Sequence, residues 1–166
     1  MVRKAHIYRK IRKRQFLLHE GEICKYSCFV TKGCLRSYRI SDDGNEHILR
    51  FAVENWWVND NESYRTGQPS KSNIDALEDS EVILISKDNL DLLMKEIPNL
   101  QQLIEKLQAR SYDASQQRIY LNISSTALQK YDHFIKTYPT LIGRLPLRTI
   151  AAYLGVSRET LSRIRN

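Results

Sequence analysis

Long apolar stretches and the apolar core of a secretory signal are both absent from this sequence of 166 residues. No apolar run approaches the roughly 20 residues that a membrane-spanning helix needs, and the basic N-terminus has no apolar segment after it. We therefore expect a cytoplasmic protein with no membrane partner. The hydrophobic content of 42% is nevertheless enough for a packed core, and the charged content of 27% is ordinary.

Residues that carry catalytic chemistry are few and scattered. The four histidines stand apart, and none has a serine, cysteine or carboxylate at the spacing of a catalytic motif. A jelly-roll metalloenzyme needs histidines and glutamates from neighbouring strands, but His47 stands alone on the predicted strands. There is also no glycine-rich phosphate loop. We therefore predict that the chain is not an enzyme, and metal analysis of the purified protein would test the metalloenzyme alternative.

Only three cysteines are present, with C-x3-C-x5-C spacing. Zinc sites usually combine one close cysteine pair with a second pair or with histidines, and no second pair follows here. We interpret Cys24, Cys28 and Cys34 as small core residues of a protein in a reducing compartment. We expect no metal site, and a redox-sensing thiol is the alternative.

The positive charge is concentrated at one end of the chain. The formal net charge is +7 and the isoelectric point is near 9.4. Residues 141–166 contain five arginines and a single acidic residue, whereas residues 42–100 contain thirteen acidic and five basic residues. This distribution favours a polyanionic partner for the C-terminal part. A further basic run occupies residues 1–14, which we expect to form an exposed arm; a second nucleic-acid patch is the alternative.

The most specific pattern lies in the last twenty residues. Apolar residues recur there at the spacing of one buried helix face: Leu147, Ile150, Ala151 and Leu154. Gly155 follows and can end this helix with a positive φ. Ser157 then offers a hydroxyl cap to a second helix over residues 158–165. Two short helices joined by a glycine turn predict a helix-turn-helix, whose second member enters the major groove of DNA.

The charged residues of the second helix make the prediction sharper. Arg158 and Glu159 lie on its first turn, and Arg163 follows Glu159 by four residues on the same face. A guanidinium can pair with guanine O6 and N7, and a carboxylate can accept from cytosine N4. We favour DNA recognition over the alternative of a surface Glu–Arg pair on a small helical hairpin.

The first half of the chain alternates short apolar runs with turn residues and shows no helical period. The pattern predicts strands over residues 15–18, 26–31, 35–40, 47–53, 73–77 and 81–85. Several short strands at this spacing are typical of an antiparallel β-roll or jelly roll. With the helices that follow, the fold class is α+β.

Three helices are expected between the strands and the helix-turn-helix. The first starts at Ser86 and ends at Pro98, the second runs from 99 to 123, and the third covers 126–138 with Ser124 or Ser125 as its cap. The long helix has a 3.5-residue apolar spacing at Leu100, Ile104, Leu107, Ala114 and Leu121. This spacing predicts a coiled-coil dimer. A second apolar stripe, at Tyr112, Ile119 and Ile123, leaves open which stripe faces inward.

Residues 155–164, GVSRETLSRI, resemble the recognition helix of the Crp/Fnr transcription regulators. The predicted turns at 20–22, 32–33 and 43–44 fall where the cyclic-nucleotide-binding roll of that family has its turns. The resemblance implies a sensor roll over 1–98, a dimerisation helix over 99–123 and a DNA-binding domain over 124–166. It implies base contacts for Arg158, Glu159 and Arg163. The candidates for phosphate contacts are Ser157, Thr160, Ser162 and Arg148. Members usually continue into a β-hairpin wing, which we expect to be missing after Asn166.

The same resemblance locates an effector pocket between two late strands. The family's Gly-Glu pair corresponds to Asn59-Asp60, and its Arg-Ser pair corresponds to Ser70-Lys71 or Lys71-Ser72. A lysine ammonium does not replace the bidentate guanidinium that grips a cyclic phosphate. We therefore expect a pocket there, but not cyclic AMP as its ligand, and we identify no cofactor.

These observations predict a homodimeric, sequence-specific transcription regulator that binds a near-palindromic double-stranded operator and senses a small-molecule effector through the roll. RNA polymerase is a further candidate partner. The alternative is a ligand-binding or protein-interaction module of the same fold without DNA readout.

Overall fold

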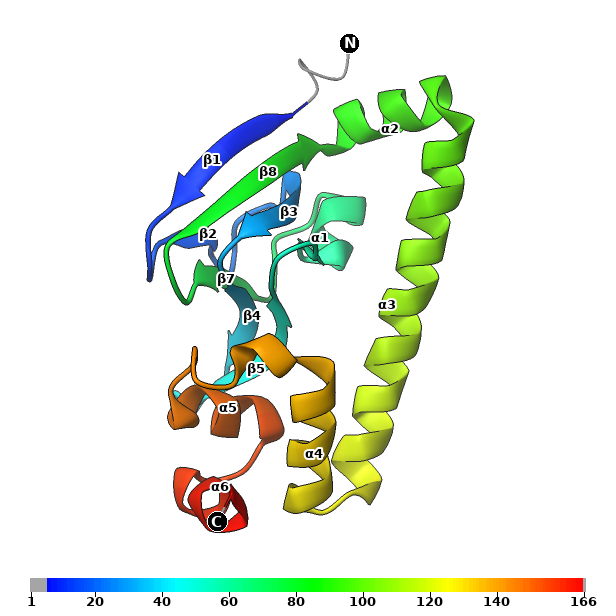
Figure 1. Cartoon of the computed structure of the whole chain (residues 1–166). Helices are drawn as coiled ribbons and strands as arrows, with labels where there is room; N and C mark the ends of the chain where they lie inside the picture. Colours follow the sequence, from blue (N-terminus) through cyan, green and yellow to red (C-terminus); the bar gives the residue numbers. More distant parts are fainter. Residues whose placement is uncertain (1–5, 166) are drawn as a thin grey trace. The chain divides into compact units, whose positions relative to one another are not determined.

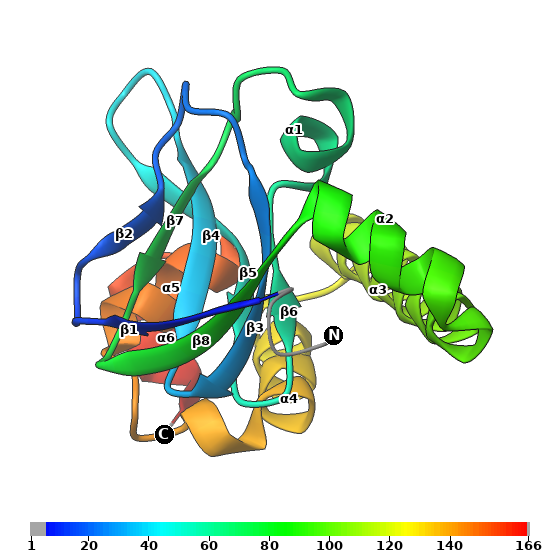
Figure 2. The same cartoon turned by 90° about the horizontal axis from the view of Figure 1, so that it is seen from above.

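The computed structural model describes residues 6–165, so Arg3 and Lys4 of the basic run and the terminal Asn166 lie outside the described residues. The chain divides into two compact units, residues 1–100 and 101–166, which we describe separately. In the described part of the first unit, eight strands form two four-stranded antiparallel sheets, with strand orders β1-β8-β3-β6 and β2-β7-β4-β5. Figure 2 shows both sheets of this roll, with β1 beside β8.

The first sheet contains β1 (Ile7–Ile11), β8 (Ser80–Ser86), β3 (Tyr26–Lys32) and β6 (Trp57–Val58). The second sheet contains β2 (Phe16–Leu18), β7 (Asn73–Ala76), β4 (Leu35–Ile40) and β5 (Glu46–Ala52). The predicted jelly-roll fold is therefore confirmed, and the six predicted strands are all present with small shifts at their ends.

The prediction of an exposed arm before the first strand was wrong. Residues Ile7–Ile11 form β1, which pairs along its whole length with β8. Four of its five residues are exposed because β1 is an edge strand, so its sequence lacks a clear apolar alternation. The two-residue strand β6 was also missed, since two residues are too few to show a period.

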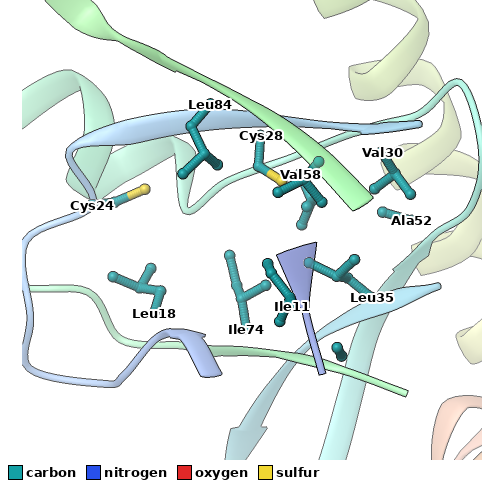
Figure 3. Close-up of a cluster of buried hydrophobic side chains, with 12 residues drawn as sticks. Ile11, Leu18, Cys24, Cys28, Val30, Leu35, Ala52, Val58, Ile74 and Leu84 are labelled. Atoms are coloured by element: carbon teal, nitrogen blue, oxygen red, sulfur yellow. The ribbon is translucent and has the colours of Figure 1, made fainter. Parts of the chain in front are cut away.

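The core of the roll lies between the two sheets (Figure 3). Cys28 and Val30 of β3 are fully buried and face Leu35 and Ile74 of the other sheet, and Val82 of β8 is fully buried in the same cluster. This arrangement follows from strand geometry, because alternate residues point to the same face. Cys24, Cys28 and Cys34 are all buried, so they contribute to the interior as predicted.

Three helices accompany the roll. The short α1 (Asn61–Thr66) connects β6 to β7, and α2 (Lys87–Glu96) follows β8 with Ser86 as its N-cap. The long α3 (Pro98–Ser124) starts at the proline that was expected to end the preceding helix. Pro98 therefore both follows the end of α2 and begins α3, because proline disrupts a helix interior but suits the first position of a new helix.

The second unit holds most of α3, then α4 (Ala127–Thr137), the 3₁₀ helix η2 (Pro139–Leu141), α5 (Leu147–Leu154) and α6 (Arg158–Arg165) (Figure 1). The predicted cap of α4 was wrong. Ser124 is still part of α3, and Thr126 caps α4 through a reciprocal capping box with Gln129. The bounds predicted for the last two helices are confirmed.

Gly33, in the turn between β3 and β4, has no room for a side chain. Its φ is +95°, and an added Cβ would lie 2.3 Å from the Ser80 hydroxyl and 2.8 Å from the Asp79 carbonyl oxygen. We predict that Gly33→Ala lowers the free energy of unfolding by at least about 2 kcal/mol, because backbone strain and a steric clash add together. Urea unfolding of the purified chain measures this loss.

Gly44 is the matched control for this prediction. It also has a positive φ, +82°, but an added Cβ would meet nothing within 4 Å. Gly44→Ala should therefore cost only the backbone strain, about 1–2 kcal/mol. Equal losses for the two variants would show that the contact with Ser80 contributes nothing.

Candidate nucleic-acid interface

The turn between α5 and α6 is built around Gly155. Its φ of 67° and ψ of 36° are left-handed, as the sequence predicted, and its N–H donates to the carbonyl of Ala151. The N–H of Val156 donates to the same carbonyl at 3.1 Å. These bonds satisfy the C-terminal end of α5 and turn the chain sharply. Ala151 is buried, so the two helices approach each other over a small side chain.

The start of α6 is capped and its middle is anchored. The Ser157 hydroxyl accepts from the N–H of Thr160 at 3.1 Å, which confirms Ser157 as the N-cap. Leu161 is fully buried where α6 packs against α4 and α5. One face of α6 is therefore fixed to its own unit and the other face is left for solvent.

The three residues predicted to read bases lie on this exposed face. Arg158, Glu159 and Arg163 are all exposed, and within the described residues no ion pair joins Glu159 to Arg163. Arg163 instead donates from Nη2 to the Thr160 hydroxyl at 3.4 Å, and that hydroxyl also receives a bond from Ser157 at 3.0 Å. Neither Arg158 nor Glu159 takes part in an ion pair among residues 6–165, so both charged groups are available to a ligand.

The predicted phosphate contacts surround this trio. Ser157, Ser162 and Arg148 are exposed, and Thr160 is half-buried because it bonds within the first turn of α6. Arg165 adds a further exposed cation to the last turn. The helix thus carries three arginines and one glutamate, which suits an anionic surface.

The sequence prediction missed a contact that holds α3 to α5. The Arg118 guanidinium carbon lies 3.9 Å from the centre of the Tyr153 ring, and Nη2 donates to the Tyr153 carbonyl oxygen at 2.9 Å. The Tyr153 ring in turn packs on Phe134 and Tyr138, with centroid separations of 5.6 and 5.7 Å. Arg118 falls between Ala114 and Leu121 in the 3.5-residue apolar spacing of the long helix, where the sequence indicates only a polar interruption. In the structure it joins α3 to α5.

The residues predicted to form an effector pocket are partly brought together. Asp60 caps α1 by accepting from the Ser63 N–H at 3.1 Å, and it also accepts from the Ser70 hydroxyl at 2.7 Å. The Ser70 oxygen lies 2.8 Å from the Ser72 carbonyl and accepts from the Ser72 N–H at 3.1 Å. These polar groups are therefore already satisfied inside the loop.

Lys71 and Asn59 lie outside this hydrogen-bonded group. Lys71 is exposed and pairs with the Glu62 carboxylate at 3.1 Å, and Asn59 is half-buried. A cavity of about 430 Å³ does exist in the roll, but none of the five predicted pocket residues lines it. Its apolar lining comes from several strands, namely Leu17, Leu18, Val58, Ile74 and Leu84. We call this space the roll cavity.

Burial suppresses the reactivity of the cysteines. Desolvation, together with the neighbouring Cys24, raises the pKa of the Cys28 thiol to about 12, and burial also raises the pKa of Cys24. Both thiols are therefore protonated at neutral pH. Within residues 6–165, no group of three or more His, Cys, Asp or Glu side chains is arranged to hold a metal ion.

The five residues of the predicted dimer seam are distributed unevenly between interior and solvent. Leu100, Ile104, Leu107 and Leu121 are half-buried, and Ala114 is exposed. The second stripe is the more open one, because Tyr112 is 65% exposed, Ile119 53% and Ile123 82%. No helix among the described residues is both long and apolar enough to cross a bilayer.

The chain thus combines a jelly roll, a long helix and a helix-turn-helix with an exposed Arg-Glu-x-x-x-Arg face. Residues 8–96 match the family model of the cyclic nucleotide-binding domain, which is more than half of the chain. The chain belongs to this family and, within it, to the Crp/Fnr regulators.

Relatives and solved structures agree with this assignment. The chain is 30% identical to the fumarate and nitrate reduction regulatory protein of Yersinia pestis, over 93% of this chain and 65% of that protein. It is 27% identical to the transcriptional activator protein anr of Pseudomonas aeruginosa, over 94% and 68%. The chain thus spans about two thirds of the length of these relatives. FixK2 from Bradyrhizobium japonicum has the same fold, with a TM-score of 0.81 at 21% identity over 96% of this chain and 82% of that one.

We predict that Arg118→Ala lowers the free energy of unfolding of the second unit by about 1–3 kcal/mol. The variant loses a cation–π contact and a charged hydrogen bond at once. Urea unfolding followed by circular dichroism of the helices measures the loss. Arg110→Ala is the control, because Arg110 is an exposed arginine on the same helix; equal effects of the two substitutions would contradict a specific role for the Tyr153 contact.

Proposed function

We propose that the chain is a sequence-specific, DNA-binding transcription regulator that acts as a homodimer. The observation that carries the proposal is the supported helix α6, which buries Leu161 and exposes Arg158, Glu159 and Arg163. A helix anchored in this way can lie in a major groove with its N-terminal residues on base edges. The names of the relatives, which are regulators and a transcriptional activator, agree with this role.

In this proposal the polar residues of α5, of the turn and of α6 have different tasks. Arg158 and Arg163 donate to guanine edges, and Glu159 accepts from cytosine. Ser157, Thr160, Ser162 and Arg148 position the helix on the phosphates, which contributes affinity but little sequence information. A protein that binds an operator must share a compartment with the DNA, so we infer a cytoplasmic location.

A dimer is needed for two recognition helices to enter successive major grooves about 34 Å apart on a near-palindromic operator. We infer that α3 supplies the dimer contact and that the seam is the open stripe of Tyr112, Ile119 and Ile123. These residues follow one another by seven and four positions, which keeps them on one helix face. The first stripe, in which every residue except Ala114 is half-buried, then packs within its own chain.

The roll would sense an effector and α3 would transmit the change to the helix-turn-helix. The contact between Arg118 and Tyr153 supports this route, because it ties α3 directly to α5. RNA polymerase would be the partner that reads the outcome on DNA. Activation and repression are both compatible with this arrangement.

Selection of bound sequences from a random DNA pool is the primary test. A fluorescence-anisotropy titration with the selected site and with random DNA then measures specificity at two salt concentrations. The selected site should bind at least about a thousandfold more tightly, with a steep salt dependence. A ligand-binding or protein-interaction module without DNA readout would bind both DNAs equally weakly.

We predict that Arg158→Ala reduces the affinity for the selected operator by about 1–3 kcal/mol and relaxes base preference at one position in each half-site. The loss follows from removing a bidentate contact to a base. Anisotropy titrations against single-base variants of the operator measure both effects.

Arg148→Ala provides the contrast. A phosphate contact should be lost uniformly across sequences, and the salt slope should fall by about one. If Arg158→Ala produced the same uniform loss, Arg158 would be a phosphate contact and the proposed base reading by this side chain would be wrong.

We also predict that Ile119→Glu converts the dimer to a monomer, because a carboxylate would be buried in the apolar seam. Sedimentation equilibrium measures the mass. Ala114→Glu is the matched control, since Ala114 is exposed on the same helix but belongs to the other stripe. If Ala114→Glu dissociates the dimer and Ile119→Glu does not, the seam is the stripe that contains Leu107.

A further inference from the structure

Two cations line the roll cavity without a partner among the residues that the structure describes. Arg9 of β1 and Lys25 of the turn before β3 both line it. Among residues 6–165, no hydrogen bond or ion pair engages either side chain. Their neighbours Tyr8 and Lys10 are engaged elsewhere, because both contact Glu81.

The register of β1 places Arg9 on the inner face of the first sheet. Arg9 lies opposite Val82, and Ile7 lies opposite Leu84. Residues directly opposite one another in an antiparallel pair share a face. Val82 and Leu84 are both buried in the core, whereas Arg9, at a position of the same face where an apolar residue is expected, is exposed where it lines the cavity.

The charges around the cavity suit a single negative charge. Glu22 is the one carboxylate of the lining, and it accepts from the backbone N–H of His19 at 3.0 Å. Two cations against one carboxylate leave a net positive charge of about one, which matches a monoanion better than a phosphate dianion. A guanidinium is also well shaped to bind a carboxylate through two parallel bonds.

The rest of the lining suits an apolar body. Apart from the three charged residues, its only polar side chains are the Cys24 thiol and the Tyr26 hydroxyl, and the thiol already donates to the Tyr26 carbonyl at 3.4 Å. No amide or further carboxylate is present to bind a sugar or a base. Ile23 and Tyr26, which are 47% and 37% exposed, continue the apolar surface outward.

We propose that the roll cavity binds a medium-chain monocarboxylate, with its hydrocarbon chain between the sheets and its carboxylate on Arg9 and Lys25. The volume of about 430 Å³ is that of a small-molecule site. This site is separate from the loop of residues 59–72. The role of this ligand as an effector rests on the proposed regulatory function. The binding of the ligand to the roll cavity does not depend on that function.

Isothermal titration of the whole chain with sodium decanoate, without DNA, tests the site. Decanoate should bind, and Arg9→Gln and Lys25→Gln should each weaken binding about tenfold, because each removes a charged hydrogen bond. Lys25 lies in an exposed turn, so its variant keeps the test available if Arg9→Gln does not fold. Leu17→Trp should abolish binding by filling the cavity while both cations remain.

Arg12→Gln is the matched control, because Arg12 is an exposed arginine next to β1 that does not line the roll cavity. It should leave decanoate binding unchanged. Equal weakening by Arg12→Gln, or no binding of decanoate below its micelle concentration, overturns the proposal. Arg9 would then be an inward-pointing charge that protects an edge strand from pairing with other chains.

A binding measurement with phosphatidylglycerol vesicles distinguishes a free carboxylate ligand from a lipid surface. Binding to vesicles without binding to decanoate also overturns the proposal. Because the titration contains no DNA, its failure leaves operator binding unaffected. Loss of operator specificity in the selection experiment would conversely refute the regulator while leaving the carboxylate site standing.

Discussion

The exposure of Arg158, Glu159 and Arg163 on one helix face depends on the burial of one side chain, Leu161. An isolated helix of eight residues is not stable in water, so α6 exists only because its apolar face packs against α4 and α5. Full burial of a leucine contributes about 1.5–3 kcal/mol. Ala151 and Gly155 make this packing possible, since one lets the helices approach closely and the other turns the chain between them.

The helix-turn-helix could be predicted to the residue because its signals are local. A helical apolar period, a glycine and a serine cap all lie within twenty residues, and each has a direct structural meaning. The contact of Arg118 with Tyr153 could not be predicted in this way, because its partners are separated by 35 positions. A single arginine in an apolar stripe indicates only an interruption; its ring partner becomes visible when α3 and α5 are packed.

In the roll, too, features marked by neighbouring residues could be predicted, and features built from distant residues could not. A strand bounded by clear turn residues, such as β4 between the turns at 32–33 and 43–44, was predicted at its observed bounds, whereas β1 was hidden because four of its five residues are exposed. The effector pocket was predicted from positions that correspond to a family motif. Those positions are joined by hydrogen bonds of their own, and the roll cavity is lined instead by residues of six strands and one turn, which no single segment of sequence reveals.

Arginine occupies two kinds of surroundings in this molecule, and their shapes suit different anions. On α6 the guanidinium groups stand on a convex, exposed helix, which suits a polyanion that extends beyond the contact. Arg9 instead lines an apolar space of about 430 Å³ in the roll, which no duplex can enter. The acidic excess over residues 42–100 further disfavours nucleic acid there. A bound monocarboxylate would thus change the charge balance of the roll without competing with DNA for the same groups, which is the condition that a regulator with separate sensing and reading sites must meet.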